Sequence, residues 1–484
     1  MKTDTIAAIA TAMSDSGIGI IRVSGNEAVE IVNRVYQNVR HENILKKYKS
    51  HTIHYGFIVE DDGTVLDEVM ISVMKAPRSY TMEDTVEINC HGGVLMMQKI
   101  LSLVMKAGAR IAEPGEFTKR AFLNGRIDLS EAEAVMDIIH AKNEFALQSS
   151  VKQLKGSVYE KIKNLREEIL YEIAFIESAL DDPEHISLDG YSEKLSDRIE
   201  NIIIKLDKLL YSADNGKMLK EGINTVILGK PNVGKSSLLN LLAGKERAIV
   251  TDVAGTTRDI LEETIILDQI TLNMIDTAGI RNTEDVVERI GVEKARNISK
   301  EADLILYVID SSAMLDESDE EIIRIINRKN TIILLNKSDL DEVTDIQSVI
   351  DVIRKVIKHD VTVSSKDNSY YKIEGFDCPV YIIKTSTKKE DGIELLTTLI
   401  KDMFFHGELV YNDEVYITNA RHQEALYDAR QSLEEVRKSL EMNMPEDFYS
   451  IDLMSAYTSL GFIIGEEVGD DLVNEIFSKF CMGK

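Results

Sequence analysis

The sequence predicts a multidomain chain that combines α/β parts with an all-α part. Near the middle of the chain, a glycine-rich loop at residues 229–236 lies between an apolar run and a helical pattern. Helical periodicity flanks this central region on both sides, and short strand and helix patterns alternate over residues 1–121. The length of 484 residues agrees with about two to four domains, and a hydrophobic fraction of 44% suffices to fill their cores.

The central loop reads Gly-Lys-Pro-Asn-Val-Gly-Lys-Ser. It follows the apolar run 225–228 and precedes the helical pattern 237–242, which is the context of a phosphate-binding loop rather than of a simple glycine-rich turn. Lys235 would reach the β- and γ-phosphates, and the Ser236 hydroxyl would bind Mg²⁺. The loop N–H groups and the helix N-terminus hold negative charge. The expected nucleotide contacts here are Asn232, Val233, Gly234, Lys235, Ser236 and Ser237.

Two later segments are expected at the γ-phosphate. The segment after the apolar run 270–275 consists of Asp276, Thr277, Ala278 and Gly279. Its aspartate can hold the magnesium shell, and its glycine N–H can sense the γ-phosphate. The other segment, Gly-Thr-Thr-Arg-Asp from residue 255, is placed to cover the γ-phosphate as a switch, with Thr257 as second magnesium ligand. The alternative for Gly255, Thr256 and Thr257 is a polar turn.

Two further segments select the base. The first follows the run 332–335 and consists of Asn336, Lys337, Ser338 and Asp339. The Asp339 carboxylate can accept hydrogen bonds from both N1–H and the exocyclic amine of guanine, which favours GTP over ATP. Asn336 would support the base, and the Lys337 stem would pack on its face. The second segment follows the run 380–383 and could approach the guanine O6; it consists of Ser386, Thr387 and Lys388. The complete set predicts a Ras-like P-loop G domain that binds GTP.

One expected group is missing from this set. Many regulatory GTPases place a glutamine after Asp-Thr-Ala-Gly, where it orients the attacking water. This chain has Ile280 there, which cannot form the hydrogen bond. Activation of the water must therefore come from another residue, an ion or a partner.

Charge and cysteine content narrow the functional classes. A net charge of −27 disfavours a protein that coats nucleic acid, although it leaves room for a local basic patch. The acidic run 316–321 is interpreted as solvated surface. Three widely spaced cysteines fit neither a disulfide framework nor a zinc site and suit a reducing cytoplasm. No apolar run reaches membrane-spanning length, and residues 6–10 are interpreted as a first strand rather than a secretory signal.

The regions outside the G domain divide into an α+β part and a helical part. In the first, strands are expected at 6–10, 17–25 and 85–90, and His91-Gly92-Gly93 opens a helix. Those glycines could admit a ligand or only make a turn. Ser130 and Glu133 fit a capping box, and helical periodicity continues from 135 to 180. It recurs in the ranges 195–209, 426–440 and 472–477. The predicted domains are 1–121, 122–218, 219–404 and 405–484, with the G domain inserted into one discontinuous helical domain.

Several further motifs identify a family. Residues 19–25 read Gly-Ile-Ile-Arg-Val-Ser-Gly, and residues 90–93 read Cys-His-Gly-Gly. Residues 76–84 read Ala-Pro-Arg-Ser-Tyr-Thr-Met-Glu-Asp, residues 113–125 read Glu-Pro-Gly-Glu-Phe-Thr-Lys-Arg-Ala-Phe-Leu-Asn-Gly, and residues 480–484 read Phe-Cys-Met-Gly-Lys. With these motifs and the GTPase segments, the chain resembles the MnmE (TrmE) family of tRNA-modification GTPases along its full length. Against that family, residues 363–378 form a longer polar insertion.

The resemblance implies cofactors and their ligands. It implies an N-terminal tetrahydrofolate-binding-like domain that also dimerises, in which 5-formyltetrahydrofolate would contact Arg22, Glu87, Arg126 and Lys484. It implies paired G domains with K⁺ in the place of an arginine finger, held by Asn232, Thr251, Val253 and Thr256. It adds Thr251, Asp252, Val253 and Ala254 to the GTP-contacting switch, and it makes Glu288 the residue that helps to orient water. Without the resemblance, Glu288 would be interpreted as the start of a surface helix.

The resemblance also implies a reaction and partners. With its FAD-containing partner MnmG (GidA), in a heterotetramer, the family adds an aminomethyl or carboxymethylaminomethyl group at C5 of the wobble uridine of certain tRNAs. Cys481 is either a buried small side chain or a thiol needed for modification. The alternative function for the G domain is that of a ribosome-assembly switch. The net charge of −27 and residues 1–121 favour the tRNA-modifying enzyme, because assembly factors carry a basic appendage instead.

Overall fold

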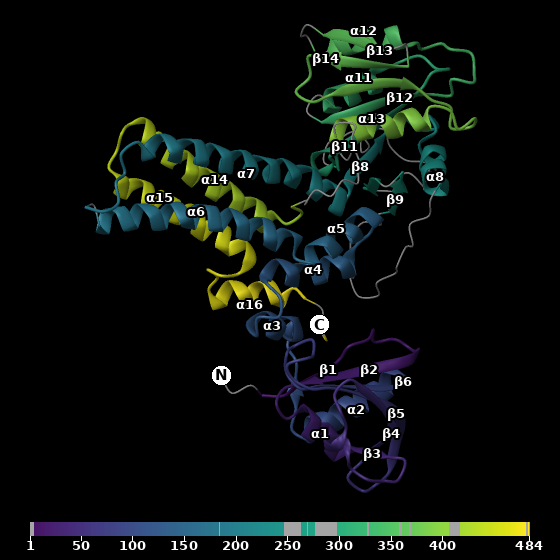
Figure 1. Ribbon diagram of the computed structural model, residues 1–484. Coiled ribbons are helices and arrows are strands. Elements are labelled where there is room, and N and C mark those ends of the chain that lie inside the picture. The colour runs from purple at the N-terminus through teal and green to yellow at the C-terminus, as the bar shows by residue number, and fades with distance from the viewer. Residues whose placement is uncertain are drawn as a thin grey trace. The chain divides into compact units, whose positions relative to one another are not determined.

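A computed structural model gives the fold of the chain (Figure 1). It describes residues 4–182, 184–245, 263–268, 270–275, 298–326, 329–357, 361–366, 369–405, 417–480 and 483. The chain forms two compact units, each described here by itself. Unit 1 consists of Met1–Ile139, Ser150–Leu206 and Glu424–Lys484, and unit 2 consists of His140–Ser149 and Asp207–Gln423. The bounds of the four predicted domains stay predictions.

Unit 1 begins with a seven-stranded sheet in the order β3-β4-β5-β6-β2-β1-β7. The strands are β1 (Ile6–Ile9), β2 (Ser16–Ser24), β3 (Tyr36–Asn38), β4 (Thr52–Val59), β5 (Val65–Met74), β6 (Thr85–Gly92) and β7 (Arg110–Ile111). Neighbours pair antiparallel except β1 and β7. The helices α1 (Ala28–Val35) and α2 (Val94–Lys106) cover one face, where side chains such as Ile21 and Val23 are buried. The three predicted strands of this region are confirmed.

The end of β6 shows that the expected helix start is wrong. His91 and Gly92 belong to the strand, and α2 begins only at Val94. Gly92 pairs with Ser16 of β2. A Cβ at Gly92 would lie 2.2 Å from Ser16 Oγ and 2.4 Å from its carbonyl oxygen. The structure therefore favours close strand packing over ligand approach as the reason for Gly92.

Helices make up the rest of unit 1 and the links to unit 2. They are α3 (Glu116–Leu123), α4 (Leu129–His140), α5 (Glu144–Leu154), α6 (Ser157–Asp181), α7 (Tyr191–Glu221), α14 (Ala420–Glu441), α15 (Glu446–Ile464) and α16 (Asp470–Ser478). The periodicity over 135–180 therefore belongs to three helices, with Gly156 in a left-handed conformation (φ +86°) immediately before α6. The pattern gave no sign of α15, which packs along α6. Among the described residues, no helix has the length and apolarity that a membrane crossing needs.

The cap of α4 differs from the expected one. Asp128 Oδ1 accepts from the Glu131 N–H at 3.0 Å, and Glu131 Oε2 accepts from the Asp128 N–H at 2.9 Å. This reciprocal pair is a capping box at Asp128, two residues before the expected Ser130. The Ser130 hydroxyl instead donates to Asp128 Oδ1 at 2.6 Å. The predicted Ser130–Glu133 box is wrong because an aspartate two residues earlier already satisfies the first turn.

Unit 2 contains an eight-stranded sheet in the order β13-β14-β15-β12-β11-β8-β10-β9. The strands are β8 (Ile223–Leu228), β9 (Glu263–Leu267), β10 (Ile270–Met274), β11 (Leu304–Asp310), β12 (Asn330–Asn336), β13 (Thr362–Lys366), β14 (Tyr370–Glu374) and β15 (Val380–Lys384). The five strands from β15 to β10 are parallel. One face packs on α8 (Lys235–Lys245) and α13 (Ile393–Phe405), and the other on α11 (Glu317–Ile325) and α12 (Ile346–Ile357).

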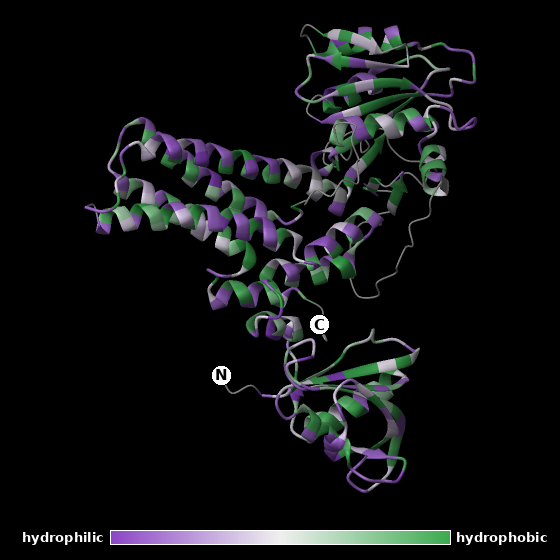
Figure 2. Cartoon of the chain, viewed as in Figure 1, coloured by the Kyte–Doolittle hydropathy of each residue, from purple (hydrophilic) through white to green (hydrophobic). Residues whose placement is uncertain are grey.

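Hydropathy explains the three layers of unit 2. The strands are hydrophobic along their length because helices cover both faces (Figure 2). The helices alternate hydrophobic and hydrophilic side chains, so each buries one face (Figure 2). The insertion at 363–378 forms most of the β13–β14 hairpin, which pairs with β15 and extends the sheet. Ile373 of this hairpin is 1% exposed, so the insertion contributes to the core.

Candidate functional site

The phosphate loop connects the central strand β8 with α8, and its shape depends on glycine. Gly229 and Gly234 have φ values of +145° and +106°. A Cβ at Gly229 would lie 2.4 Å from the Val308 carbonyl oxygen, and one at Gly234 would lie 2.2 Å from Asn336 Nδ2. Contacts this short exclude a side chain at either position. The two glycines therefore let the loop pack against β11 and β12 while its N–H groups stay available to phosphate.

Lys235 folds back over this loop. Its ammonium donates to the carbonyl oxygens of Gly229 at 2.7 Å and of Lys230 at 2.5 Å. Burial lowers the pKa of Lys235 to about 8. Its carbonyl partners carry only partial negative charge, so phosphate oxygens would be a stronger counter-charge for the ammonium.

Asn336 links the loops of the site. Its side chain is buried, with Nδ2 donating to the Val233 carbonyl at 2.8 Å and Oδ1 accepting from the Thr387 N–H at 3.1 Å. Asn336 thus joins the phosphate loop to the 386–388 segment. The structure shows this link between the two loops, and the expected support of a base by Asn336 stays a prediction.

The residues predicted to select the base lie at the same edge of the sheet. The Ser386 hydroxyl donates to Asp339 Oδ1 at 2.7 Å, and this bond lowers the pKa of the Asp339 carboxyl. An ionised carboxylate accepts from both guanine donors. Lys337 has φ +62°, and its ammonium forms an ion pair with Asp310 at 2.5 Å. The ammonium is thereby fixed at one end, while the aliphatic stem remains available to pack on a base.

The sequence alone does not predict the role of Asp310 or the ion pairs of Lys230. Lys230 of the phosphate loop pairs with Asp316 at 2.9 Å and Asp319 at 2.7 Å, at the N-terminus of α11. Asp319 is 1% exposed and also accepts from the Tyr307 hydroxyl at 2.7 Å. The interpretation of this acidic run as solvated surface is therefore wrong for Asp319. A site role for Asp310 could have been expected from its position, because it is the first polar residue after the apolar run of β11.

Several expected site residues lie outside the described part of the chain. They are Thr251, Asp252, Val253, Ala254, Gly255, Thr256, Thr257, Asp276, Thr277, Ala278, Gly279, Ile280, Glu288, Cys481 and Lys484. The structure brings together the others in unit 2: the phosphate loop, the segment 336–339 and the segment 386–388.

A second cluster lies in unit 1 around Tyr80. Arg22 Nε donates to Glu87 Oε1 at 2.8 Å across the β2–β6 pair. The Arg22 guanidinium lies 5.8 Å from the centre of the Tyr80 ring, and that of Arg126 lies 4.7 Å from it. Arg22 Nη1 also donates to the Gly483 carbonyl at 3.3 Å. Two of the four expected folate contacts, Arg22 and Arg126, therefore lie near one aromatic ring, and a third, Glu87, is held by Arg22. Tyr80 lies within the motif 76–84, but the sequence predicts no role for it.

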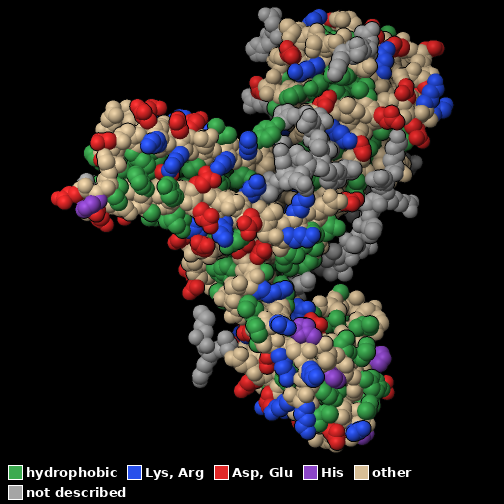
Figure 3. Space-filling model, viewed as in Figure 1, with side chains coloured by type: hydrophobic (Ala, Val, Ile, Leu, Met, Phe, Trp, Pro, Cys, Tyr) green, Lys and Arg blue, Asp and Glu red, His purple; other side chains and the backbone are tan. Residues whose placement is uncertain are grey.

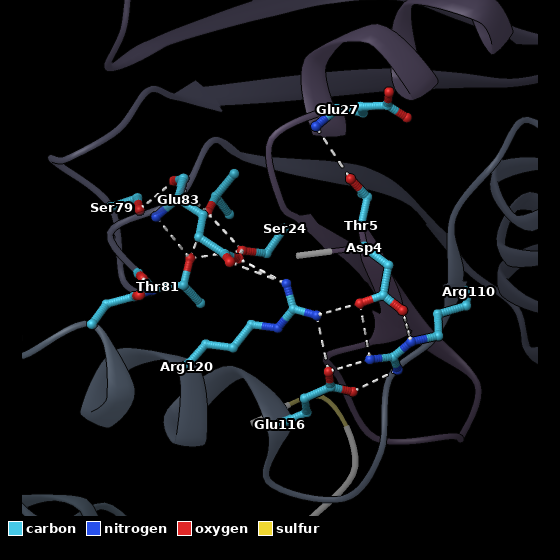
Figure 4. Close-up of polar contacts among 12 residues, drawn as sticks. Asp4, Thr5, Ser24, Glu27, Ser79, Thr81, Glu83, Arg110, Glu116 and Arg120 are labelled. Atoms are coloured by element: carbon cyan, nitrogen blue, oxygen red, sulfur yellow. Dashed lines mark hydrogen bonds and ion pairs between the residues drawn. The ribbon is translucent and has the colours of Figure 1, made fainter. Parts of the chain in front are cut away.

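A partly buried charge network holds the segment that carries Tyr80 (Figure 4). Arg120 of α3 contacts Glu83 at 3.1 Å, Glu116 at 3.0 Å and Asp4 at 3.3 Å. Arg110 contacts Glu116 at 2.5 Å and Asp4 at 2.5 Å. Burial alone would raise the pKa of Glu116, but the hydrogen bond from Arg110 holds that pKa below its usual value. The network joins α3, Asp4 (two residues before β1) and the 79–84 segment, so Tyr80 has a fixed support.

Comparison with known families covers the residues of both clusters. Residues 5–126 match the family described as GTP-binding protein TrmE N-terminus. Residues 129–481 match the family described as MnmE helical domain. The chain belongs to the MnmE (TrmE) family. The MnmE helical match includes the residues of the nucleotide site, and the TrmE N-terminal match includes Arg22, Tyr80, Glu87 and Arg126.

Relatives within the MnmE family align with the whole chain. The chain is 54% identical to the tRNA modification GTPase MnmE of Lachnoclostridium phytofermentans over 484 residues, which is all of both proteins. It is 45% identical to the protein of that name from Thermoanaerobacter pseudethanolicus, over 485 aligned positions and all of both proteins. It is 46% identical to that of Acetivibrio thermocellus, again over the full length of both.

Proposed function

We propose that this chain is a GTP hydrolase that modifies tRNA in the cytoplasm. With an FAD-dependent partner of the MnmG type, it adds a (carboxymethyl)aminomethyl group at C5 of the wobble uridine, U34. The observation that carries the proposal is full-length similarity to tRNA modification GTPases, at 54% identity in one case, joined to a phosphate loop linked to the base-selecting segments by Asn336.

In the proposed nucleotide site, each described residue has a task. Gly234 and its neighbours direct backbone N–H groups at the phosphates, and Lys235 neutralises the β- and γ-phosphate oxygens. Asp339 accepts from the two guanine donors, with Ser386 holding the carboxylate in its ionised form. Mg²⁺ would be held by Ser236 and Thr257 and would neutralise charge on the phosphate oxygens.

Water activation is proposed to involve K⁺ and Glu288. Ile280 cannot position the water, so another group has to do so. Asn232 has an exposed side chain and a left-handed backbone (φ +62°) within the phosphate loop. Its amide oxygen is a suitable cation ligand, with Thr251, Val253 and Thr256 as the other proposed ones. Glu288 would then orient the water.

The Tyr80 cluster fits a folate in chemical terms. Glu87 is a carboxylate that can accept from the N–H groups of a pterin, and Arg22 and Arg126 suit the carboxylates of a glutamate tail. The Tyr80 ring lies near both guanidinium groups and offers a flat apolar surface. We therefore propose a folate-binding-like N-terminal domain with 5-formyltetrahydrofolate as ligand, Lys484 being the fourth contact.

We further propose a homodimer formed through the N-terminal sheet. The face opposite α1 and α2 exposes Ile53 of β4, Tyr55 of β4 and Met70 of β5, which are 67%, 50% and 51% exposed. Tyr55 and Met70 are direct partners in the β4–β5 register, so these apolar side chains are adjacent. Such a patch is typical of an interface between chains. The G domain is proposed to be inserted in the helical domain, and the dimer to bind two partner subunits in a heterotetramer.

Nucleoside mass spectrometry on bulk tRNA tests the proposal. Cells that lack the gene are compared with cells rescued by the wild-type chain or by Lys235→Ala. We expect the C5-modified wobble uridine to disappear without the gene and to return only with the wild type. An unchanged nucleoside profile would reject the tRNA-modification function, and ribosome profiles would then test the assembly-switch alternative.

A further inference from the structure

The charges of the chain are distributed very unevenly. Residues 1–121 contain 14 Lys and Arg against 15 Asp and Glu, whereas residues 122–484 contain 42 against 68. Almost the whole net charge of −27 therefore comes from residues 122–484. An RNA phosphate backbone is repelled by such a surface and attracted by a local cluster of cations. Any RNA-binding surface of this protein is thus expected where cations gather without matching carboxylates.

One such cluster lies in the N-terminal α/β part of unit 1. Figure 3 shows Lys and Arg side chains gathered on one face of this part, over α1. We define the basic patch as Arg34, Lys46, Lys47, Lys49, Lys75 and Arg78. Five of these side chains are exposed and Lys75 is half-buried.

Hydrogen bonds join the elements that carry the basic patch. Arg34 lies in the last turn of α1, and the short 3-10 helix Leu45–Lys47 is tied to α1 by the Leu45 N–H, which donates to Asn33 Oδ1 at 2.8 Å. Lys75 Nζ donates to the Lys46 carbonyl at 3.4 Å. The Arg78 N–H donates in turn to the Lys75 carbonyl at 3.1 Å. These hydrogen bonds therefore connect the elements on which the six cations lie.

Carboxylates neutralise only a small part of the basic patch. Glu30 pairs with both Lys46 and Arg34, so one negative charge is shared by two cations. Among the described residues, no ion pair is recorded for Lys47, Lys49, Lys75 or Arg78. Asp84, the other carboxylate close to this segment, accepts from the Ala76 N–H. The patch keeps a large excess of positive charge on an otherwise acidic protein.

We infer that the basic patch binds the phosphate backbone of the tRNA substrate. This inference rests on the proposed function, in which a tRNA is the substrate of a protein of net charge −27. Exposed lysines on flexible stems suit phosphates, whose geometry varies along the RNA, and they carry no base specificity. The patch therefore supplies affinity and orientation, and the choice of tRNA lies elsewhere.

Salt-dependent tRNA binding by the full-length chain tests the inference. The patch variant carries Lys47→Gln, Lys49→Gln and Lys75→Gln. The matched control carries Lys161→Gln, Lys194→Gln and Lys208→Gln, which are exposed lysines of α6 and α7. Both variants have the same net charge. Fluorescence anisotropy with labelled tRNA is measured from low to moderate salt, with GTP hydrolysis and thermal unfolding as checks of folding.

We expect the patch variant to bind tRNA about tenfold or more weakly, and its slope of log affinity against log salt to be shallower by about two to three. The control should keep the wild-type slope. Equal losses in both variants, or no loss in the patch variant, would overturn the inference. So would a patch variant that keeps tRNA binding and loses binding to vesicles containing phosphatidylglycerol, because the patch would then serve a membrane surface. Failure of the proposed function is detected separately, as an unchanged nucleoside profile.

Discussion

The packing of the phosphate loop depends on the absence of a side chain at Gly234. At Gly234, the space that a Cβ would need is filled by the amide of Asn336, 2.2 Å away. That amide in turn holds Val233 and Thr387 in place. A change at Gly234 therefore displaces the residue that joins the phosphate and base ends of the site.

We predict that Gly234→Ala lowers GTP affinity by at least about tenfold. The methyl group would clash with Asn336, and the positive φ of +106° strains any L side chain by about 1–3 kcal/mol. Gly244→Ala is the matched control, because nothing lies within 4 Å of the position that a Cβ would occupy there. In α8 it should be neutral or stabilise by up to about 1 kcal/mol. Nucleotide titration and thermal unfolding measure both, and equal behaviour of the two variants would contradict the packing argument.

The half-buried Lys235 is expected to make nucleotide binding depend on pH. In the free protein its pKa is lowered to about 8, and phosphate oxygens favour the charged form. Binding above that pH therefore requires uptake of a proton. We predict constant GTP affinity below about pH 7 and a fall of about tenfold per pH unit above about 8.

Affinity titrations between pH 7 and 9.5 check this prediction. Lys235→Arg provides the control, because an arginine stays charged throughout this range. Its affinity should be lower overall but should lack the lysine's contribution to the pH dependence. A wild-type profile that matches that of Lys235→Arg would show that Lys235 does not titrate in this range.

At the scale of elements, helix starts depend on single hydrogen bonds. Asp128 and Glu131 cap α4 reciprocally, while Ser130 only supports Asp128. We predict that Asp128→Ala lowers the free energy of unfolding by about 0.5–2 kcal/mol. Ser130→Ala should cost less, because the backbone N–H of Glu131 keeps its acceptor. Denaturant unfolding of both variants measures these free energies. A larger loss of stability for Ser130→Ala would instead support the Ser130 cap expected from the sequence.

Local patterns predicted the elements of the nucleotide site well. The phosphate loop, β12 and β15 follow from apolar runs that end in polar residues, and parallel strands bring such ends to one edge. Helix breaks near 141–143 and at Gly156 were not predictable in this way, because the apolar period continues across them. The burial of Asp319 depends on Tyr307 and Lys230, which are distant in sequence. Pairings of this kind require the fold before they can be identified.

At the scale of the whole molecule, GTP hydrolysis is predicted to depend on the monovalent cation. Ile280 removes the usual water-positioning amide, and paired G domains with K⁺ would replace it. We expect faster hydrolysis in K⁺ than in Na⁺ at equal ionic strength. Asn232→Ala should abolish this difference while still binding GTP, because Asn232 is the proposed ligand from the phosphate loop. Equal rates of the wild type in the two salts would contradict the proposal.

The packing of α6 has a consequence for biosynthesis. This helix buries an apolar stripe that includes Ile162, Ile169 and Ile176, and it packs along α15. The ribosome makes α15 roughly 265 residues after α6 is complete. At a synthesis rate of about 5–20 residues per second, about 13–53 s pass between the synthesis of α6 and that of α15. During this interval the nascent chain presents a long apolar surface, so α6 is the segment where we expect a chaperone to bind first.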